Sequence, residues 1–190
     1  MVVATPPRLR RDARDNREAI LDAARELFAD SADVAMCQVA KRAGVGQATL
    51  YRNFPNRGAL AAEIMDEHVE RMAALAAEHE GDPDAFFVLM RSMIDGMVTM
   101  YAFAVLARSD AATDSHLKRA RRRMAEILKG PLCEAKSTGA LRRDLSLDDI
   151  FLLLAMGRGA MEGLPDAAAR SAVAHRVLAL QLGGIEARPA

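Results

Sequence analysis

The chain has 190 residues, enough for one large domain or for a small domain joined to a medium-sized one. Its 26 Lys and Arg residues balance its 26 Asp and Glu residues, so any affinity for nucleic acid has to come from local charge. Apolar residue types make up 51% and charged types 27%, which is typical of globular proteins. These figures exclude a highly basic coating protein and a disordered chain.

The two cysteines, Cys37 and Cys133, lie far apart in the sequence, which argues against a disulfide framework and indicates a reducing compartment. Residues 1–17 contain no apolar stretch of signal-peptide length. No later segment approaches about 18 uninterrupted apolar residues. We therefore expect a cytoplasmic protein that does not span a membrane.

The composition and the hydrophobic pattern favour helices throughout. Aromatic residues are scarce, Ala and Leu are abundant, and apolar residues recur every three or four positions. No segment alternates between apolar and polar residues as a strand would. The first helix is predicted over residues 15–30, and a second, short helix is predicted to end near Ala43.

The next two helices are predicted from local signals. Gly44 stands where a helix C-terminus favours a residue that tolerates positive φ. A short helix is predicted over residues 47–53, because Phe54 precedes a proline and is disfavoured in the helical region. Asn56 is the predicted cap of a longer helix that runs to about His79.

Residues 80–83 form the clearest linker, and Pro83 is the predicted first residue of the next helix, which continues to about Arg108. A further helix is predicted to begin near Thr113. Pro131 removes a backbone donor within it, so we expect a bent or interrupted helix there.

The last two helices have clear boundaries. Gly139 is predicted to end the preceding helix, and Ser146 with an acidic residue three positions later predicts a capped helix through about Met161. The final helix is predicted over residues 166–182, where Gly183 and the glycine after it should stop it.

Residues 36–60 carry the most informative pattern in the chain. They form a predicted short helix, a glycine turn and a second short helix. Ala40 is small enough for a close helix crossing, and Val45 and Leu50 are placed to seal the joint. This is the helix-turn-helix arrangement of DNA-binding domains.

The charge pattern agrees with a surface that faces DNA phosphates. No Asp or Glu occurs between residues 34 and 62, whereas Lys41, Arg42, Arg52 and Arg57 are basic. The first 60 residues contain ten basic and seven acidic side chains. Four arginines ahead of the first predicted helix are expected to act as an arm that reaches phosphates or a minor groove. They are Arg8, Arg10, Arg11 and Arg14.

Residues 16–63 resemble the DNA-binding domain of the TetR family of bacterial transcriptional regulators. The matching motifs, in order, are Ala23-Ala24, Leu27-Phe28, Val39-Ala40, Ala43-Gly44-Val45, Thr49-Leu50-Tyr51, Phe54-Pro55 and Ala59-Leu60. The resemblance implies an all-α protein, with a three-helix DNA-binding domain over residues 1–60 and a helical effector-binding and dimerisation domain over residues 61–190. It also implies a homodimeric regulator, most often a repressor, that binds a palindromic operator in double-stranded DNA and responds to a small molecule.

The resemblance assigns a DNA-reading surface residue by residue. The assigned residues are Gln47, Ala48, Thr49 and Tyr51 on the recognition face, Arg52, Asn53 and Arg57 near phosphates or neighbouring bases, and Lys41 on the preceding helix. Gln can pair with adenine, the methyl groups of Ala and Thr can touch thymine, and Arg can bind guanine or phosphate. Two alternatives remain, since Tyr51 can pack inside the small domain and Lys41 can lie on an ordinary solvated face. Ala35 stands where relatives often have a Ser or Thr that caps the second, short helix.

The resemblance further implies a small-molecule cavity in the second domain. The predicted lining residues are Met93, Met97, Tyr101, Phe103, Met124 and Phe151. Met is flexible and polarizable, and few polar residues accompany it, so a hydrophobic or amphipathic effector is expected. Ordinary core packing is the alternative for each methionine. The basic run over residues 118–123 is predicted to be a solvated helix face, with an anionic ligand as the alternative.

Apolar stripes on the last two predicted helices suit a four-helix dimer interface. They consist of Leu147, Ile150, Phe151, Leu154, Val173, Val177 and Leu180. The four His and two Cys residues lack metal-ligand spacing, and no catalytic or nucleotide-binding motif occurs, so we expect no metal, no cofactor and no enzyme. The alternatives are a helical ligand-binding or protein-interaction module that does not read DNA sequence and, more distantly, a small enzyme.

Overall fold

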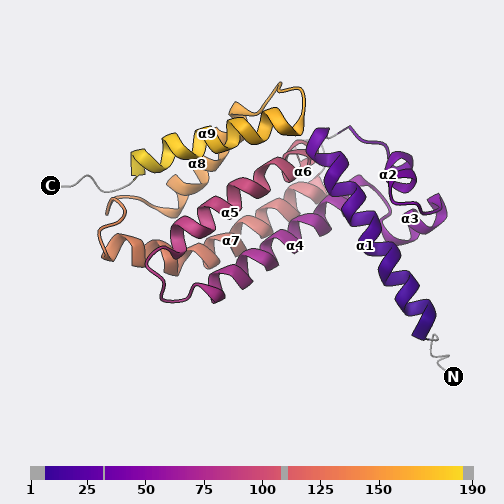
Figure 1. Ribbon diagram of the computed structural model, residues 1–190, viewed down its shortest axis with the longest axis horizontal. Coiled ribbons are helices and arrows are strands. Elements are labelled where there is room, and N and C mark those ends of the chain that lie inside the picture. The colour runs from indigo at the N-terminus through magenta and orange to yellow at the C-terminus, as the bar shows by residue number, and fades with distance from the viewer. Residues whose placement is uncertain (1–6, 32, 108–110, 186–190) are drawn as a thin grey trace.

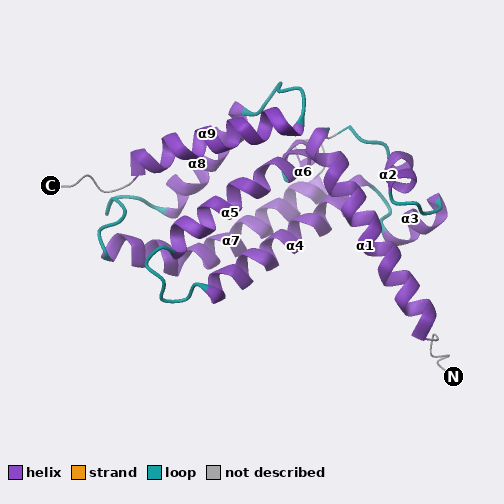
Figure 2. Cartoon of the chain, viewed as in Figure 1, coloured by secondary structure: helices purple, strands orange, loops and turns teal. Residues whose placement is uncertain are grey.

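The computed structural model describes residues 7–31, 33–107 and 111–185, and within these ranges it leaves out the side chains of residues 7–12, 99, 102, 103, 107, 184 and 185. All regular elements in the described part of the chain are helices, which confirms the all-α prediction (Figure 2). None of the described helices is long and apolar enough to cross a lipid bilayer.

Helices α1 (Pro7–Asp30), α2 (Met36–Arg42) and α3 (Gln47–Asn53) form a small unit at one end of the molecule (Figure 1). The bounds of α3 are those predicted. Helix α1 begins earlier than predicted, because the fixed φ of Pro7 suits a first helical turn. The four arginines expected ahead of the helix therefore lie on the backbone of α1 itself, so their placement before the helix was wrong. Their contact with phosphates or a minor groove stays a prediction.

Local hydrogen bonds set the turn and the cap on either side of α3. Gly44 has a φ of 68°, as its position predicted, and the amide of Val45 donates to the carbonyl of Ala40 at 3.0 Å. At the start of the following helix, the side-chain oxygen of Asn56 accepts a hydrogen bond from the Ala59 amide at 2.8 Å. Hydrogen bonds from residues a few positions away thus hold α3 in place.

Helices α4 (Arg57–Glu78), α5 (Ala85–Thr99), α6 (Tyr101–Ala107) and α7 (Ala111–Ser137) form the adjoining bundle (Figure 1). Helix α5 begins two residues after the predicted Pro83. The continuous helix predicted to reach residue 108 is instead divided at Met100. No breaker residue occurs at that point, so packing of α6 against α4 and α7, not local sequence, accounts for the division.

Helix α7 continues through Pro131 to Ser137, so this proline does not interrupt it. Helix α8 (Leu147–Ala160) has the predicted capping box, in which the Ser146 hydroxyl accepts from the Asp149 amide at 3.2 Å and the Asp149 carboxylate accepts from the Ser146 amide at 2.8 Å. Helix α9 (Ala167–Ile185) runs past the two glycines predicted to stop it, because glycine lowers helix stability without preventing helix formation.

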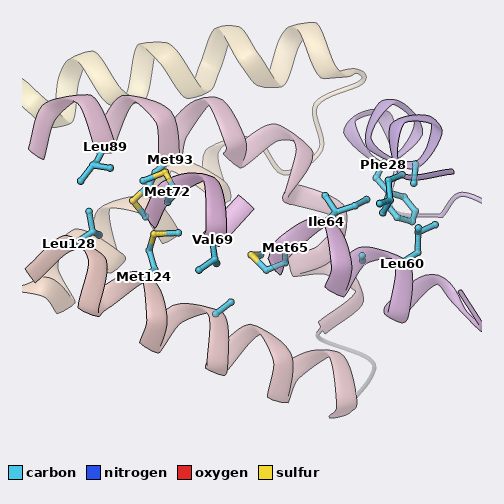
Figure 3. Close-up of a cluster of buried hydrophobic side chains, with 14 of the residues drawn as sticks. Phe28, Leu60, Ile64, Met65, Val69, Met72, Leu89, Met93, Met124 and Leu128 are labelled. Atoms are coloured by element: carbon cyan, nitrogen blue, oxygen red, sulfur yellow. The ribbon is translucent and has the colours of Figure 1, made fainter. Parts of the chain in front are cut away.

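The hydrophobic core is continuous from the small unit into the bundle. Figure 3 shows its labelled side chains in a row that runs from Phe28 and Leu60 at one end to Leu89 and Leu128 at the other. Helix α4 contributes along most of this row. The domain boundary predicted at residue 60 falls inside α4, which begins at the small unit and continues as a wall of the bundle.

A buried arginine connects the last helix to the first. The Arg170 side chain is 5% exposed and donates to the Ala29 carbonyl at 2.6 Å and to the Leu164 carbonyl at 3.0 Å. Its guanidinium lies 4.8 Å from the centre of the Tyr101 ring. Because Ala29 is in the last turn of α1, this side chain ties α9 to the small unit formed by α1, α2 and α3.

Replacing Arg170 should destabilise the fold. Arg170→Met removes a buried guanidinium and leaves two partly buried carbonyls without their donor, so we expect the free energy of unfolding to fall by about 2 to 4 kcal/mol in urea titrations at fixed protein concentration. Arg176→Met, at an exposed position of the same helix, should change it by less than about 0.5 kcal/mol. Equal denaturation midpoints for Arg170→Met and the wild type would contradict this account.

Candidate DNA-binding surface and cavity

The outer face of α3 presents the predicted base-reading residues. Leu50 is fully buried and Phe54 is 3% exposed, and together they fix which side of the helix faces inward. Gln47, Ala48, Tyr51 and Arg52 are exposed, and Thr49 and Asn53 are partly exposed. Tyr51 is 49% exposed, so the alternative that it packs in the core of the small domain was wrong.

Two of the polar side chains on α3 lie back on their own helix. Arg52 donates to the Ala48 carbonyl at 3.2 Å and to the Thr49 hydroxyl at 3.1 Å, and the Asn53 amide donates to the Thr49 carbonyl at 2.8 Å. The Gln47 side chain, by contrast, forms no hydrogen bond to any described residue. Its amide is therefore open to a partner from outside the chain.

Helix α2 supports this face. Ala35 offers no side-chain cap, and its own amide instead donates to the side chain of Gln38 at 2.8 Å. Lys41 is exposed in the last turn, whereas Arg42 forms an ion pair with Glu26 of α1 at 2.5 Å. Arg57, at the start of α4, donates to Asp33 at 3.0 Å. The basic groups at the edge of the face are thus partly held by neighbouring carboxylates.

Ion pairs between α1 and α4 hold the small unit against the bundle. Arg17 pairs with Glu63 at 2.6 Å and its guanidinium lies 4.7 Å from the centre of the Phe54 ring. Arg25 pairs with Glu67 one turn further along α4. The position of α3 is therefore set by α1 and α4 together.

A cavity of about 260 Å³ lies among helices α4, α5, α7 and α8. Four of the six predicted lining residues border it, namely Met93, Met97, Met124 and Phe151. Tyr101 does not border it and stacks against Arg170 instead. The side chain of Phe103 lies outside the described residues.

Sequence reasoning missed His68, which lines the cavity from α4. Its side chain is 7% exposed and forms no hydrogen bond to any described residue. A Cβ atom at Gly96 would lie 2.4 Å from its Cε1 atom, so the close approach of α5 requires glycine there. The sequence signal that could have identified His68 is its position between Ile64 and Met72, four residues from each, on the apolar face of α4.

Burial keeps the His68 imidazole neutral. Removal from water, with a smaller contribution from the nearby positive charge of Arg71, lowers the pKa of His68 from 6.5 to about 4. At neutral pH the ring therefore offers one donor nitrogen and one acceptor nitrogen.

The basic run on α7 is largely paired with carboxylates, as a solvated helix face would be. The pairs are Lys118 with Asp114 at 2.7 Å, Arg119 with Asp66 at 3.3 Å, Arg121 with Asp148 at 3.2 Å, and Arg123 with Glu70 at 2.6 Å. Arg121 differs from the others, because it also borders the cavity and stacks over the Phe151 ring at 4.7 Å.

No group of His, Cys, Asp and Glu side chains within the described part of the chain could hold a metal ion. Cys37 and Cys133 are both exposed and unbridged.

Comparison with known protein families identifies both parts of the chain. Residues 20–64 match the family described as bacterial regulatory proteins, tetR family. Residues 82–187, more than half of the chain, match the family described as transcriptional regulator SbtR-like, C-terminal domain. The chain belongs to the TetR family. TetR-family proteins are DNA-binding transcriptional regulators and not enzymes.

Solved TetR-family structures share this fold over nearly the whole chain. A TetR regulatory protein from Mycobacterium vanbaalenii is 28% identical, with a TM-score of 0.64 over 94% of this chain and 99% of that one. A TetR regulator from Streptomyces coelicolor is 27% identical, with a TM-score of 0.67 over 91% and 99%. An HTH-type transcriptional regulator of Staphylococcus aureus is 26% identical over 89 residues, 46% of this chain. The match spans 48%, about half, of the length of such curated relatives.

The buried His68 predicts a specific loss of stability in acid. Between pH 6.5 and about 4 the unfolded chain binds a proton at His68 that the folded protein does not, so the free energy of unfolding falls as the pH falls through this window. The contribution of His68 to this loss is about 3 kcal/mol. Urea titrations of the wild type and His68→Met across this range should show a shallower pH dependence for the variant. Parallel curves would contradict a buried neutral imidazole.

Proposed function

We propose that this TetR-family protein is a repressor that binds a palindromic operator as a homodimer and leaves it when a small hydrophobic or amphipathic molecule occupies the cavity. The observation that carries the proposal is the exposed face of α3, in a segment without Asp or Glu from residue 34 to residue 62. A helix presented in this way, with basic side chains at its edge, is suited to the major groove. Operator binding would take place in the cytoplasm, where bacterial DNA lies.

The chemistry of α3 supports direct reading of bases. The open amide of Gln47 can form a bidentate pair with adenine, and the methyl groups of Ala48 and Thr49 can contact thymine. Each good bidentate pair is worth about 1 to 3 kcal/mol of discrimination. The remaining proposed contacts, to phosphates or neighbouring bases, are made by Tyr51, Arg52, Asn53, Arg57 and Lys41.

Release of Arg52 from its own helix fits this role. Its bonds to Ala48 and Thr49 are exposed to water, so they contribute little to stability and can be exchanged for a phosphate or guanine oxygen. The Arg57 pair with Asp33 is similarly accessible, because the Asp33 side chain is 97% exposed.

Exposed apolar side chains on α8 and α9 support a dimer. Leu152 and Met156, about one turn apart on α8, are each 59% exposed, and Leu180 on α9 is 61% exposed. Exposed apolar side chains that form a contiguous patch mark interaction surfaces. Ile150, assigned to the interface stripe from the sequence, is fully buried within one chain and is corrected here to a core residue. A two-fold interface would bring the same α8 and α9 faces of two copies together.

The cavity supports control by a ligand. A ligand can shift the protein away from DNA only by binding more tightly to the shape that cannot bind the operator. Met65, His68 and Val69 of α4 border the cavity, and the same helix begins beside α3. Movement of α4 would change the separation of two recognition helices, which has to match half-sites about 34 Å apart or a multiple of that.

Sequence-specific binding predicts an enriched operator and its loss in a defined variant. A random-library selection with the wild type should enrich a palindrome, and anisotropy titrations on that DNA should weaken steeply as salt rises. Gln47→Ala with Thr49→Ala should weaken binding at least about tenfold, because base contacts are lost. Arg143→Ala, exposed in the loop before α8, is the matched control and should bind as the wild type does.

A selection that enriches no sequence, or a double variant that binds the selected DNA as tightly as the wild type, would overturn the assignment of α3 as the reader. Binding to a protein partner through this unit would then be the better account, since apolar contacts would not show the same dependence on salt.

The dimer proposal predicts the mass of the wild type in solution and a variant in which that mass is halved. Sedimentation at micromolar concentration should give twice the 20.6 kDa of one chain. Leu152→Glu with Leu180→Glu should give the mass of one chain while retaining the helical circular dichroism spectrum, because charged groups would have to be desolvated at the interface. Arg143→Glu should leave the dimer intact. A wild type that sediments as one chain would contradict the proposal.

A further inference from the structure

We propose that the cavity selects an amphipathic organic anion, whose apolar body packs against the methionines and whose carboxylate pairs with Arg121 and Arg158. This inference rests on the proposed function, because it names the class of ligand that the cavity would take.

The composition of the cavity wall carries the argument. Apart from three residues, the described side chains that line it are apolar, and none of them is Asp or Glu. The three exceptions are His68, Arg121 and Arg158. With a neutral imidazole, the formal charge of the lining comes from two guanidinium groups. A positively charged ligand would meet like charge, whereas an anion would meet two cations, of which Arg121 is paired with the exposed Asp148.

Both arginines can accept a new partner. Arg158 is exposed and forms no ion pair with any described residue. Arg121 pairs with Asp148, but the Asp148 side chain is 91% exposed, and an ion pair so open to water contributes little. Stacking over Phe151 holds the Arg121 guanidinium at the cavity, so a carboxylate would bind a group that is already positioned.

The buried part of the wall favours an apolar body with a polar group near it. Met93 and Met124 are almost completely buried, and methionine adapts to ligands of varied shape. His68 is the buried lining residue whose ring nitrogens have no hydrogen-bond partner among the described residues. A ligand that hydrogen-bonds this ring in the apolar surroundings of the cavity would gain affinity and specificity.

The volume limits the size of the ligand. About 260 Å³ holds roughly nine groups of the size of a water molecule, at about 30 Å³ each. We therefore choose an eight-carbon chain as the apolar body, with its charged end proposed to lie at the arginines. Octanoate, octanol and octylamine form a matched set that differs in the charge of one end.

Isothermal titration calorimetry with this set tests the charge preference. Octanoate should bind at least about tenfold more tightly than octanol, and octylamine more weakly than octanol. Arg121→Gln with Arg158→Gln should bring octanoate to within about threefold of octanol without changing octanol binding. Arg122→Gln, in the same basic run but away from the cavity, is the matched control and should bind all three as the wild type does.

Proton magnetic resonance locates the bound ligand. The Cε1 proton signal of His68, assigned by its absence in His68→Met, should shift as octanoate is added, while the signals of the three other histidines stay in place. An unmoved His68 signal would overturn the proposed site even if octanoate bound elsewhere.

The outcomes separate this inference from the proposed function. Equal affinities for octanoate and octanol, or no binding of octanoate, would overturn the anion preference while operator binding stands. Tight octanoate binding at His68 that leaves operator affinity unchanged would uphold the ligand class and contradict effector release. Octanoate binding that persists in the double arginine variant would overturn the assignment of the two guanidiniums.

Discussion

The apolar face of α4 is the constraint on which the rest of the structure depends. Leu60 and Ile64 pack toward Phe28 of the small unit, and Met65 and Val69, further along the same helix, border the cavity. Because protein interiors are close-packed, a displacement of α4 at one end is passed to the side chains that pack along its length. The small unit that carries α3 and the cavity therefore lie along one row of packed side chains on α4.

The fold could be predicted from sequence wherever its determinants are local. The bounds of residues 47–53 follow from Gly44 before the helix and a proline after it, and both act within a few residues. The division at Met100 could not be predicted, because no residue there disfavours a helix and the packing of α6 decides it. Helix α9 likewise continues through Gly183, where local propensity alone predicted an end.

In the candidate site, too, some features could be predicted from the sequence and others could not. The exposed residues of α3 follow from the periodicity around Leu50, so the exposed face of α3 could be predicted from the resemblance and the pattern together. His68 could not be assigned to a cavity, since a histidine on an apolar stripe gives no indication of which neighbours approach it. The fully buried Ile150 and the exposed Leu152 on α8 could not be told apart either. Both are apolar, and the sequence pattern of one chain does not indicate which apolar residues face its own core and which face a partner.

The coupling proposed between ligand and DNA has a definite energetic requirement. A ligand that moves the protein from almost all DNA-competent to almost all incompetent has to favour the second shape by about 5 kcal/mol. Octanoate-sized molecules gain such a difference only if the cavity is poorly formed in one shape. Helix α1, held to α4 by Arg17 and Arg25 and to α9 by Arg170, resists any rotation of the small unit that leaves α4 in place. The ligand therefore has to act on α4 and α1 together, and the methionines and His68 on the α4 side of the cavity are where its differential contacts must lie.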